Sequence, residues 1–173
     1  GRSSQVAAMA GMRLPIESHV LQAFVTEGLK PVIDTVISFG MGATVTVVDR
    51  NPEALRRIAN QLGAHVRTMF STRDAVETVC RRADLVIGTV LVPGAAAPKL
   101  ISAATVKAMK PGSVIVDVAI DQGGCFETSR ATTHQDPIYD VDGIMHYCVA
   151  NMPGAVARTS TLALGNATLP FLL

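Results

Sequence analysis

Residues 113–125 have the sequence Ser-Val-Ile-Val-Asp-Val-Ala-Ile-Asp-Gln-Gly-Gly-Cys, in which a strand pattern runs directly into a ligand-site pattern. The β-branched apolar run at 114–116 is typical of a strand that is buried on both faces of a parallel sheet. Asp121, Gln122 and two glycines follow it. Open α/β sheets bind ligands at the carboxyl ends of their strands, so this stretch predicts a site at that edge of a sheet.

The composition indicates a globular domain without a nucleic-acid or membrane partner. The chain has 173 residues, of which 49% are hydrophobic and 4% aromatic, and this suffices for one domain with a core of small aliphatic residues. Its net charge of +1 does not favour a polyanionic partner. No apolar run approaches the roughly 20 residues that span a bilayer. Cys80, Cys125 and Cys148 are odd in number and widely spaced, which argues against a disulfide framework or a metal site and favours a reducing, cytoplasmic location.

Apolar runs and turn residues alternate along the chain in a way that predicts strands and helices in turn. Strand patterns occupy residues 44–48, 65–70, 84–90, 114–118 and 144–149, and helix patterns occupy 52–62, 73–82, 102–109 and the segment from about 155 onward. This alternation predicts an α/β fold with a doubly wound parallel sheet and right-handed crossovers. We expect residues 126–143 to be loop-rich and residues 1–39 to form a divergent N-terminal segment, mainly helical.

Asp49 ends a predicted strand at the start of a strand-to-helix turn. In dinucleotide-binding folds an acid at this place accepts hydrogen bonds from the adenosine ribose hydroxyls, and it repels a 2′-phosphate. Asp49 therefore favours NAD over NADP, although Arg50 beside it softens that preference. The alternative is that Asp49 only helps to cap the following helix, with Asn51 as the cap residue.

Two more stretches follow predicted strands. The apolar segment Thr89-Val-Leu-Val-Pro-Gly94 either sandwiches a cofactor or is a plain connecting loop. Asp121 is the best catalytic candidate, because a carboxylate beside a bound nicotinamide orients a substrate or moves a proton. Its alternative is a turn or capping aspartate. We expect Cys125 to pack rather than react, and we expect the histidines to be structural rather than metal ligands.

The chain lacks a recognisable phosphate-binding loop in the expected context. A dinucleotide-binding domain places G-x-G-x-x-G between its first strand and its first helix. The G-x-G of this chain, Gly40-Met-Gly42, comes before a predicted strand instead.

From Gly40 onward the sequence resembles the alanine dehydrogenases. The phrases that carry the resemblance lie at residues 40–51, 83–94, 97–100, 109–127 and 146–156, and also at Thr159-Ser-Thr and Asn166-Ala-Thr-Leu-Pro170. The phrase Asp121-Gln-Gly-Gly-Cys125 separates the chain from the related proton-translocating transhydrogenases.

The resemblance implies a Rossmann-like domain that binds NAD, in a family that oxidises L-alanine to pyruvate and ammonium. It implies that residues 40–154 are the NAD-binding domain and that residues 155–173 begin the helix that crosses to a substrate domain. By position, Asp121 would be the catalytic carboxylate, which works with a histidine. The implied cofactor contacts are Asp49 at the ribose, Ser71 near the adenine, Val90 and Leu91 along the cofactor, and Val118, Val149, Asn151 and Met152 near the nicotinamide.

The departures from the family matter equally. Residues 1–39 do not match it, and neither the first strand with its glycine loop nor the substrate domain is found in this sequence. We expect residues 1–39 or a second chain to replace that strand, or else the sequence is an edited or shifted version of a longer gene. The chain is therefore expected to be inactive alone. Separately, we expect it to form a homo-oligomer. Two alternatives are a non-catalytic remnant, which binds a partner or oligomerises through an exposed sheet edge, and a transhydrogenase-like NAD-binding subunit.

Overall fold

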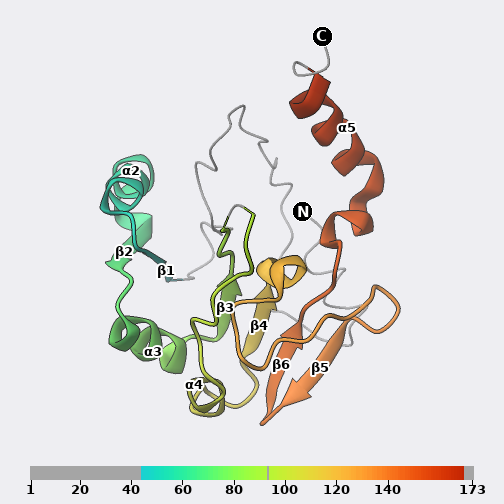
Figure 1. Ribbon diagram of the computed structural model, residues 1–173. Helices are drawn as coiled ribbons and strands as arrows, with labels where there is room; N and C mark the ends of the chain where they lie inside the picture. Colours follow the sequence, from blue (N-terminus) through green and yellow to red (C-terminus); the bar gives the residue numbers. More distant parts are fainter. Residues whose placement is uncertain (1–43, 93, 170–173) are drawn as a thin grey trace. The chain divides into compact units, whose positions relative to one another are not determined.

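The structure of the protein, a computed structural model, describes residues 44–92 and 94–169 (Figure 1). The described residues belong to two compact units, which meet in sequence between Ala150 and Asn151. All the described strands lie in the unit that ends at Ala150. The predictions for residues 1–39, and the Gly40-Met-Gly42 phrase, lie outside the described residues.

The strand–helix–strand unit that contains Asp49 forms as the sequence predicts. It consists of β1 (Val45–Asp49), α2 (Pro52–Leu62) and β2 (Val66–Phe70), and the two strands pair in parallel. Proline opens the helix, and the Asn51 side chain caps it by accepting hydrogen bonds from two backbone N–H groups. Leu55 and Ile58 of the helix pack in one cluster with Val47 and Val66 of the strands. The helix thereby covers one face of this strand pair.

A second sheet carries the stretch that follows residue 113. Its strands are β3 (Leu85–Gly88), β4 (Val114–Asp117), β5 (Ile138–Val141) and β6 (Ile144–Tyr147), in the order β3-β4-β6-β5. Strands β3, β4 and β6 are mutually parallel, which confirms the doubly wound α/β prediction. Two helices, α3 (Arg73–Arg82) and α4 (Ala103–Lys107), precede β3 and β4 (Figure 1).

The prediction that residues 126–143 are loop-rich missed one strand. β5 lies in this segment and pairs antiparallel with β6. The two strands are joined by Asp142 and Gly143, which have φ angles of 54° and 79°. A two-residue turn with both φ angles positive matches the right-handed twist of its strands, and Asp-Gly is a favoured pair for it. The sheet is therefore mixed rather than fully parallel.

The two sheets are separate in the described part of the chain. There β1 pairs only with β2, and β3 pairs only with β4. No described strand therefore pairs with both β1 and β3. Whether residues 1–39 replace the usual first strand lies outside the described residues.

The main core lies around β4. Ile115, Phe126 and Ile144 are fully buried and belong to one cluster, and Val106 and Met109 bring the α4 region into it. Phe126 follows the Asp121 stretch directly, so this aromatic residue anchors the end of the predicted site in the core.

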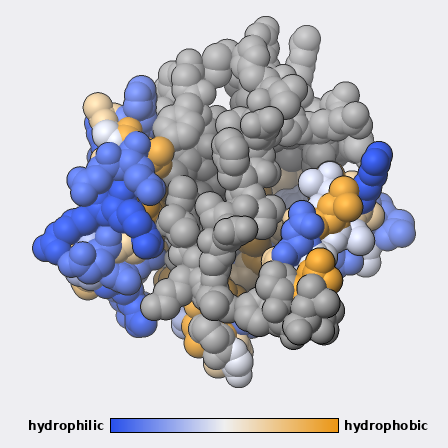
Figure 2. All heavy atoms as spheres, turned by 90° about the horizontal axis from the view of Figure 1, so that it is seen from above, coloured by the Kyte–Doolittle hydropathy of each residue, from blue (hydrophilic) through white to orange (hydrophobic). Residues whose placement is uncertain are grey.

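The described part of the other unit contains a 3₁₀ turn, η3 (Met152–Val156), and α5 (Ala157–Thr168). The predicted helix from about residue 155 is thus confirmed with a short 3₁₀ entry. Leu162 and Leu164 of α5 are more than half exposed, and apolar residues are visible on this helix in Figure 2. By contrast, the surface over α2 is mainly hydrophilic (Figure 2). Among the described helices none is both long enough and apolar enough to cross a membrane.

Candidate functional site

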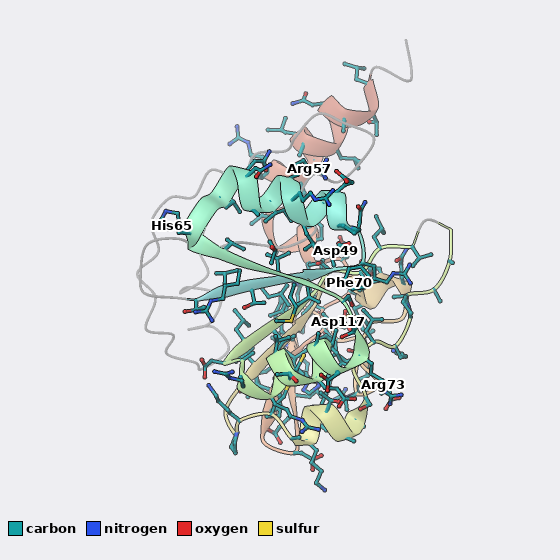
Figure 3. All side chains as sticks on the ribbon, turned by 90° about the vertical axis from the view of Figure 1, so that its left-hand side faces the viewer. Asp49, Arg57, His65, Phe70, Arg73 and Asp117 are labelled. Atoms are coloured by element: carbon teal, nitrogen blue, oxygen red, sulfur yellow. The ribbon has the colours of Figure 1, made fainter. Side chains whose placement is uncertain are left out.

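Asp49 lies half-buried at the carboxyl end of β1, paired in register with Phe70 of β2 (Figure 3). Its Oδ1 accepts a 2.6 Å hydrogen bond from the backbone N–H of Asn51. Within the described part of the chain its Oδ2 makes no hydrogen bond. Asp49 therefore supports the start of α2 through Oδ1, which is the alternative that the sequence left open. Its Oδ2 is still available to a ligand. The two interpretations of Asp49 are compatible.

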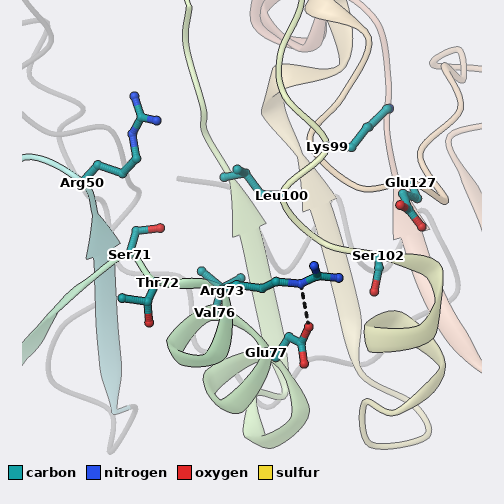
Figure 4. A pocket seen from close by; sticks show the side chains of 10 residues that line it. All are labelled: Arg50, Ser71, Thr72, Arg73, Val76, Glu77, Lys99, Leu100, Ser102 and Glu127. Atoms are coloured by element: carbon teal, nitrogen blue, oxygen red, sulfur yellow. Dashed lines mark hydrogen bonds and ion pairs between the residues drawn. The ribbon is translucent and has the colours of Figure 1, made fainter.

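An open cavity of about 350 Å³ lies beside this strand end. Arg50 and Ser71 line it from the ends of β1 and β2, and Lys99 and Glu127 line it from the opposite side (Figure 4). Ser71 is held there by the hydrogen bond from its backbone N–H to the Asp49 carbonyl, at 2.9 Å. The cavity has the volume of a small-molecule site and both charge signs in its walls. The structure thus places Ser71 beside the turn that follows β1.

The loop after β3 exposes apolar side chains near the carboxyl edge of the sheet. Val90 packs partly against the core, whereas Leu91 is 58% exposed. Val118, the first residue after β4, is 44% exposed. These aliphatic residues follow neighbouring parallel strands, so they lie at the same edge of the sheet. They offer an apolar surface to a flat ring.

Asp121 is exposed and lies on a short 3₁₀ turn, η2 (Val118–Gln122). The turn begins with Asp117, whose side chain accepts from the backbone N–H of Ala119. It ends in Gly123 and Gly124, both with positive φ. A Cβ on Gly124 would lie 2.6 Å from Oδ2 of Asp117, so only glycine permits this approach. The paired glycines of the sequence thus shape the turn that presents Asp121.

Asp117 is fully buried and is the centre of a hydrogen-bond network that sequence reasoning missed. Its Oδ2 accepts from the Cys125 backbone N–H at 2.8 Å and from Ser129 Oγ at 2.5 Å. Its Oδ1 accepts from Ala119 N–H at 3.1 Å. One carboxylate therefore joins the end of β4 to both ends of the turn that carries Asp121. An acid at the end of an otherwise apolar strand was the available sequence signal.

Lys99 supports the same turn from outside. Its Nζ donates to the backbone carbonyl of Gly123 at 2.6 Å and to that of Phe126 at 3.0 Å. Glu127 does not bond to this turn. Its carboxylate accepts a hydrogen bond from the backbone N–H of Ala103, the first residue of α4. The turn that carries Asp121 is thus bonded from the core and from the β3–α4 loop.

The Cys125 thiol and the His146 ring are both buried and hydrogen-bonded. Cys125 is buried, its thiol lies 3.6 Å from Asp117 Oδ1, and burial together with that carboxylate raises the pKa of the thiol. His146 is fully buried between the Ile144 carbonyl at Nδ1 and the Thr128 hydroxyl at Nε2, and burial lowers its pKa. No group of metal-ligating side chains occurs among residues 44–92 and 94–169.

The three remaining predicted contacts, Val149, Asn151 and Met152, follow β6 in the chain. The Val149 side chain is fully buried, so this residue offers at most its backbone to a ligand. Asn151 and Met152 belong to the other unit. Asn151 has a left-handed backbone, with φ of 57°.

Comparison with known proteins supports one assignment. A model of the family "Alanine dehydrogenase/PNT, C-terminal domain" matches residues 33–173. The alanine dehydrogenase of Halomonas elongata is 61% identical over 137 residues, which cover 79% of this chain and 37% of the relative. The chain thus spans little more than a third of the length of that relative.

Solved structures agree with the sequence comparison. An L-alanine dehydrogenase superposes with a TM-score of 0.71 and 50% identity, over 76% of this chain and 36% of its own. A transhydrogenase from Sinorhizobium meliloti superposes with a TM-score of 0.65 and 30% identity, over 76% of this chain and 37% of its own. These matches confirm the Rossmann-like fold. The chain belongs to the alanine dehydrogenase/PNT C-terminal domain family.

Proposed function

We propose that this chain binds NAD at the carboxyl edge of its strands, as the nucleotide-binding part of an alanine dehydrogenase. The observation that carries the proposal is the Asp49 carboxylate, half-buried at the end of β1 with Oδ2 available to hydroxyl donors. Ser71 and the neighbouring cavity supply room for the adenine side. A carboxylate at this turn accepts from vicinal ribose hydroxyls and repels a 2′-phosphate, so NAD is the expected nucleotide rather than NADP.

The residues at the other end of the proposed site fit a nicotinamide. Leu91 and Val118 present exposed aliphatic surface, which suits one face of an uncharged or reduced ring. NAD supplies a hydride acceptor when it is bound. Val149, Asn151 and Met152 are proposed to complete this end, as the family resemblance implies. For Asn151 and Met152, contact with the nicotinamide is proposed from the family resemblance alone.

Asp121 is proposed to handle protons for the reaction. Its exposed position on a turn held by buried groups lets the carboxylate meet a substrate or a water while its backbone stays fixed. A positioned carboxylate contributes to proton transfer by general acid–base catalysis. L-alanine and pyruvate are the proposed substrates. The histidine that the family pairs with this carboxylate is proposed to come from a substrate domain.

Several broader proposals follow from the resemblance rather than from the geometry. They are the division into an NAD-binding domain at 40–154 and a crossover helix at 155–173, a homo-oligomeric assembly, and a cytoplasmic location. A transhydrogenase-like subunit is the second candidate, supported by the 30% identical structure. The higher identity to L-alanine dehydrogenase favours the first candidate.

Calorimetric titration of NAD into the 173-residue chain tests the proposal. Asp49→Asn keeps an acceptor for the Asn51 N–H but removes the charge, and we expect NAD affinity to fall about tenfold, the equivalent of one charge-assisted hydrogen bond. We also expect discrimination against NADP to shrink, because the repulsion of the 2′-phosphate is gone. Asp136→Asn, an equal charge change on an exposed loop, is the control. Absence of NAD binding by the wild-type chain contradicts the proposal.

A further inference from the structure

Gln122 joins two loops that are 30 residues apart in sequence. Its side-chain Nε2 donates to the Val92 carbonyl at 3.1 Å, and its Oε1 accepts from the Val92 N–H at 3.3 Å. Its own backbone carbonyl accepts from the N–H of Ala97 at 2.9 Å. The amide therefore pairs with both backbone groups of one residue, much as a neighbouring strand does. Exchanging its O and N would turn both bonds into repulsive contacts, so the network fixes the amide orientation.

The two joined loops carry different parts of the proposed site. Val92 directly follows Leu91, which is exposed after β3, and Gln122 directly follows Asp121. Lys99, which reaches the Gly123 carbonyl at 2.6 Å, ties the same loop to the same turn at a second point. The half-buried position of the Gln122–Val92 pair shields it from competition by water. The two loops are therefore bonded to each other at two points.

We propose that Gln122 is a positioning residue that couples the 89–97 loop to the turn bearing Asp121. Its part in nicotinamide placement rests on the proposed function, whereas the coupling itself does not. The amide sets the spacing between the apolar surface at Leu91 and the carboxylate of Asp121. Gln122 touches neither ligand nor reacting atom in this role, and it acts through the two loops it connects.

Only an amide can make this pair of bonds. A carboxylate at the same place still accepts from the Val92 N–H, but its second oxygen opposes the Val92 carbonyl. Gln122→Glu is therefore a nearly isosteric change that opens one side of the clamp. Gln122→Met removes both bonds without adding charge. It is the second test variant, to be used if Gln122→Glu fails to fold. Gln61→Glu, on the exposed surface of α2, is the matched charge control.

The coupling is tested first without nucleotide, by hydrogen exchange in the whole chain. Both Gln122 variants should accelerate amide exchange in peptides from 89–100 and 118–125 by about fivefold or more, while peptides from α2 and β6 stay within about twofold. The Gln61 variant should match wild type throughout. Unchanged exchange at 89–100, or equal acceleration everywhere, overturns the proposal, since the first shows no clamp and the second shows only global destabilisation.

The consequence for the site is tested by comparing NAD with ADP-ribose, which lacks the nicotinamide. In the Gln122 variants we expect the Kd for NAD to rise about tenfold and the Kd for ADP-ribose to change less than about twofold. If the variants only destabilise the domain, the Kd values for NAD and ADP-ribose should rise equally, and that result overturns the positioning role. If the wild-type chain binds neither ligand, the proposed function fails, and nicotinamide placement by Gln122 fails with it. The exchange experiment still decides the coupling.

Discussion

Replacing Asp117 with asparagine removes the charge at the centre of the network that shapes the Asp121 turn. Asp117 is fully buried, and its two oxygens accept from two backbone N–H groups and from the Ser129 hydroxyl. Asparagine has the same shape but only one acceptor oxygen. In either orientation of the amide, one backbone donor, from Ala119 or from Cys125, faces an NH₂ group instead of an oxygen.

The size of the effect follows from these contacts. A buried donor without a partner costs about 1–3 kcal/mol. The remaining bonds change from charge-assisted to neutral, which costs about 1 kcal/mol each. Relief of the desolvation of a buried carboxylate offsets part of this. We therefore expect Asp117→Asn to lower the free energy of unfolding by about 2–4 kcal/mol, a large share of the 5–15 kcal/mol that is typical of a domain.

Urea denaturation followed by far-ultraviolet circular dichroism measures this loss, because the chain has no tryptophan. With a slope of about 2 kcal/mol per molar urea, the midpoint should fall by about 1–2 M. Asp136→Asn, on an exposed loop, should leave the midpoint unchanged. A loss below about 0.5 kcal/mol for Asp117→Asn would refute the reasoning, since it would mean that the network does not hold the turn.

Two further predictions concern the turn glycines and the buried histidine. Gly124→Ala and Gly143→Ala share a positive φ, but only the first places a Cβ against Asp117. Both should lose about 1 kcal/mol to backbone strain, and Gly124→Ala should lose at least about 1 kcal/mol more to the clash; equal losses in thermal melts would contradict the steric argument. Burial lowers the pKa of His146, so the unfolded chain binds the extra proton first as the pH falls. Stability is full above the unfolded pKa of about 6.5 and declines as the pH drops below it. Urea midpoints at about pH 7.5 and 5.5 should differ more in wild type than in His146→Asn, and an equal difference would show that another group dominates.

Local sequence signals predicted the first strand–helix–strand unit almost to the residue. The predicted strand at 44–48 is β1 at Val45–Asp49, and the predicted helix at 52–62 is α2 with Asn51 as its cap. Capping, proline at the first turn and β-branched runs act within a few residues, so a sequence displays them fully. Asp49 was placed correctly at the strand end for the same reason.

The missed strand β5 also had a local signal. Asp142-Gly143 lies between apolar segments that became β5 and β6, and this is a strong hairpin pattern. The polar residues around 128–137 favoured a loop, and the loop prediction was extended too far. Because β5 is an edge strand, it did not disturb the parallel core.

Contacts between distant segments could not be predicted. The Gln122–Val92 pair spans 30 residues, and the Asp117 network joins β4 to Ser129. Their partners are recognisable only after the strands have aligned in parallel, because that alignment brings successive loops to one edge. The residue types at the strand ends of the candidate site could be predicted from the sequence. The hydrogen bonds that set the distances between these residues are visible only in the structure.

The proposed function requires NAD to lie along the strand ends with its nicotinamide near the Asp121 turn. The most direct test is a methyl-labelled chain with bound NAD, in which nuclear Overhauser effects connect nicotinamide protons to protein methyl groups. We expect such effects to Leu91 and Val118, and none to methyl groups of α2. Effects confined to other elements, or no binding of NAD at all, would contradict it.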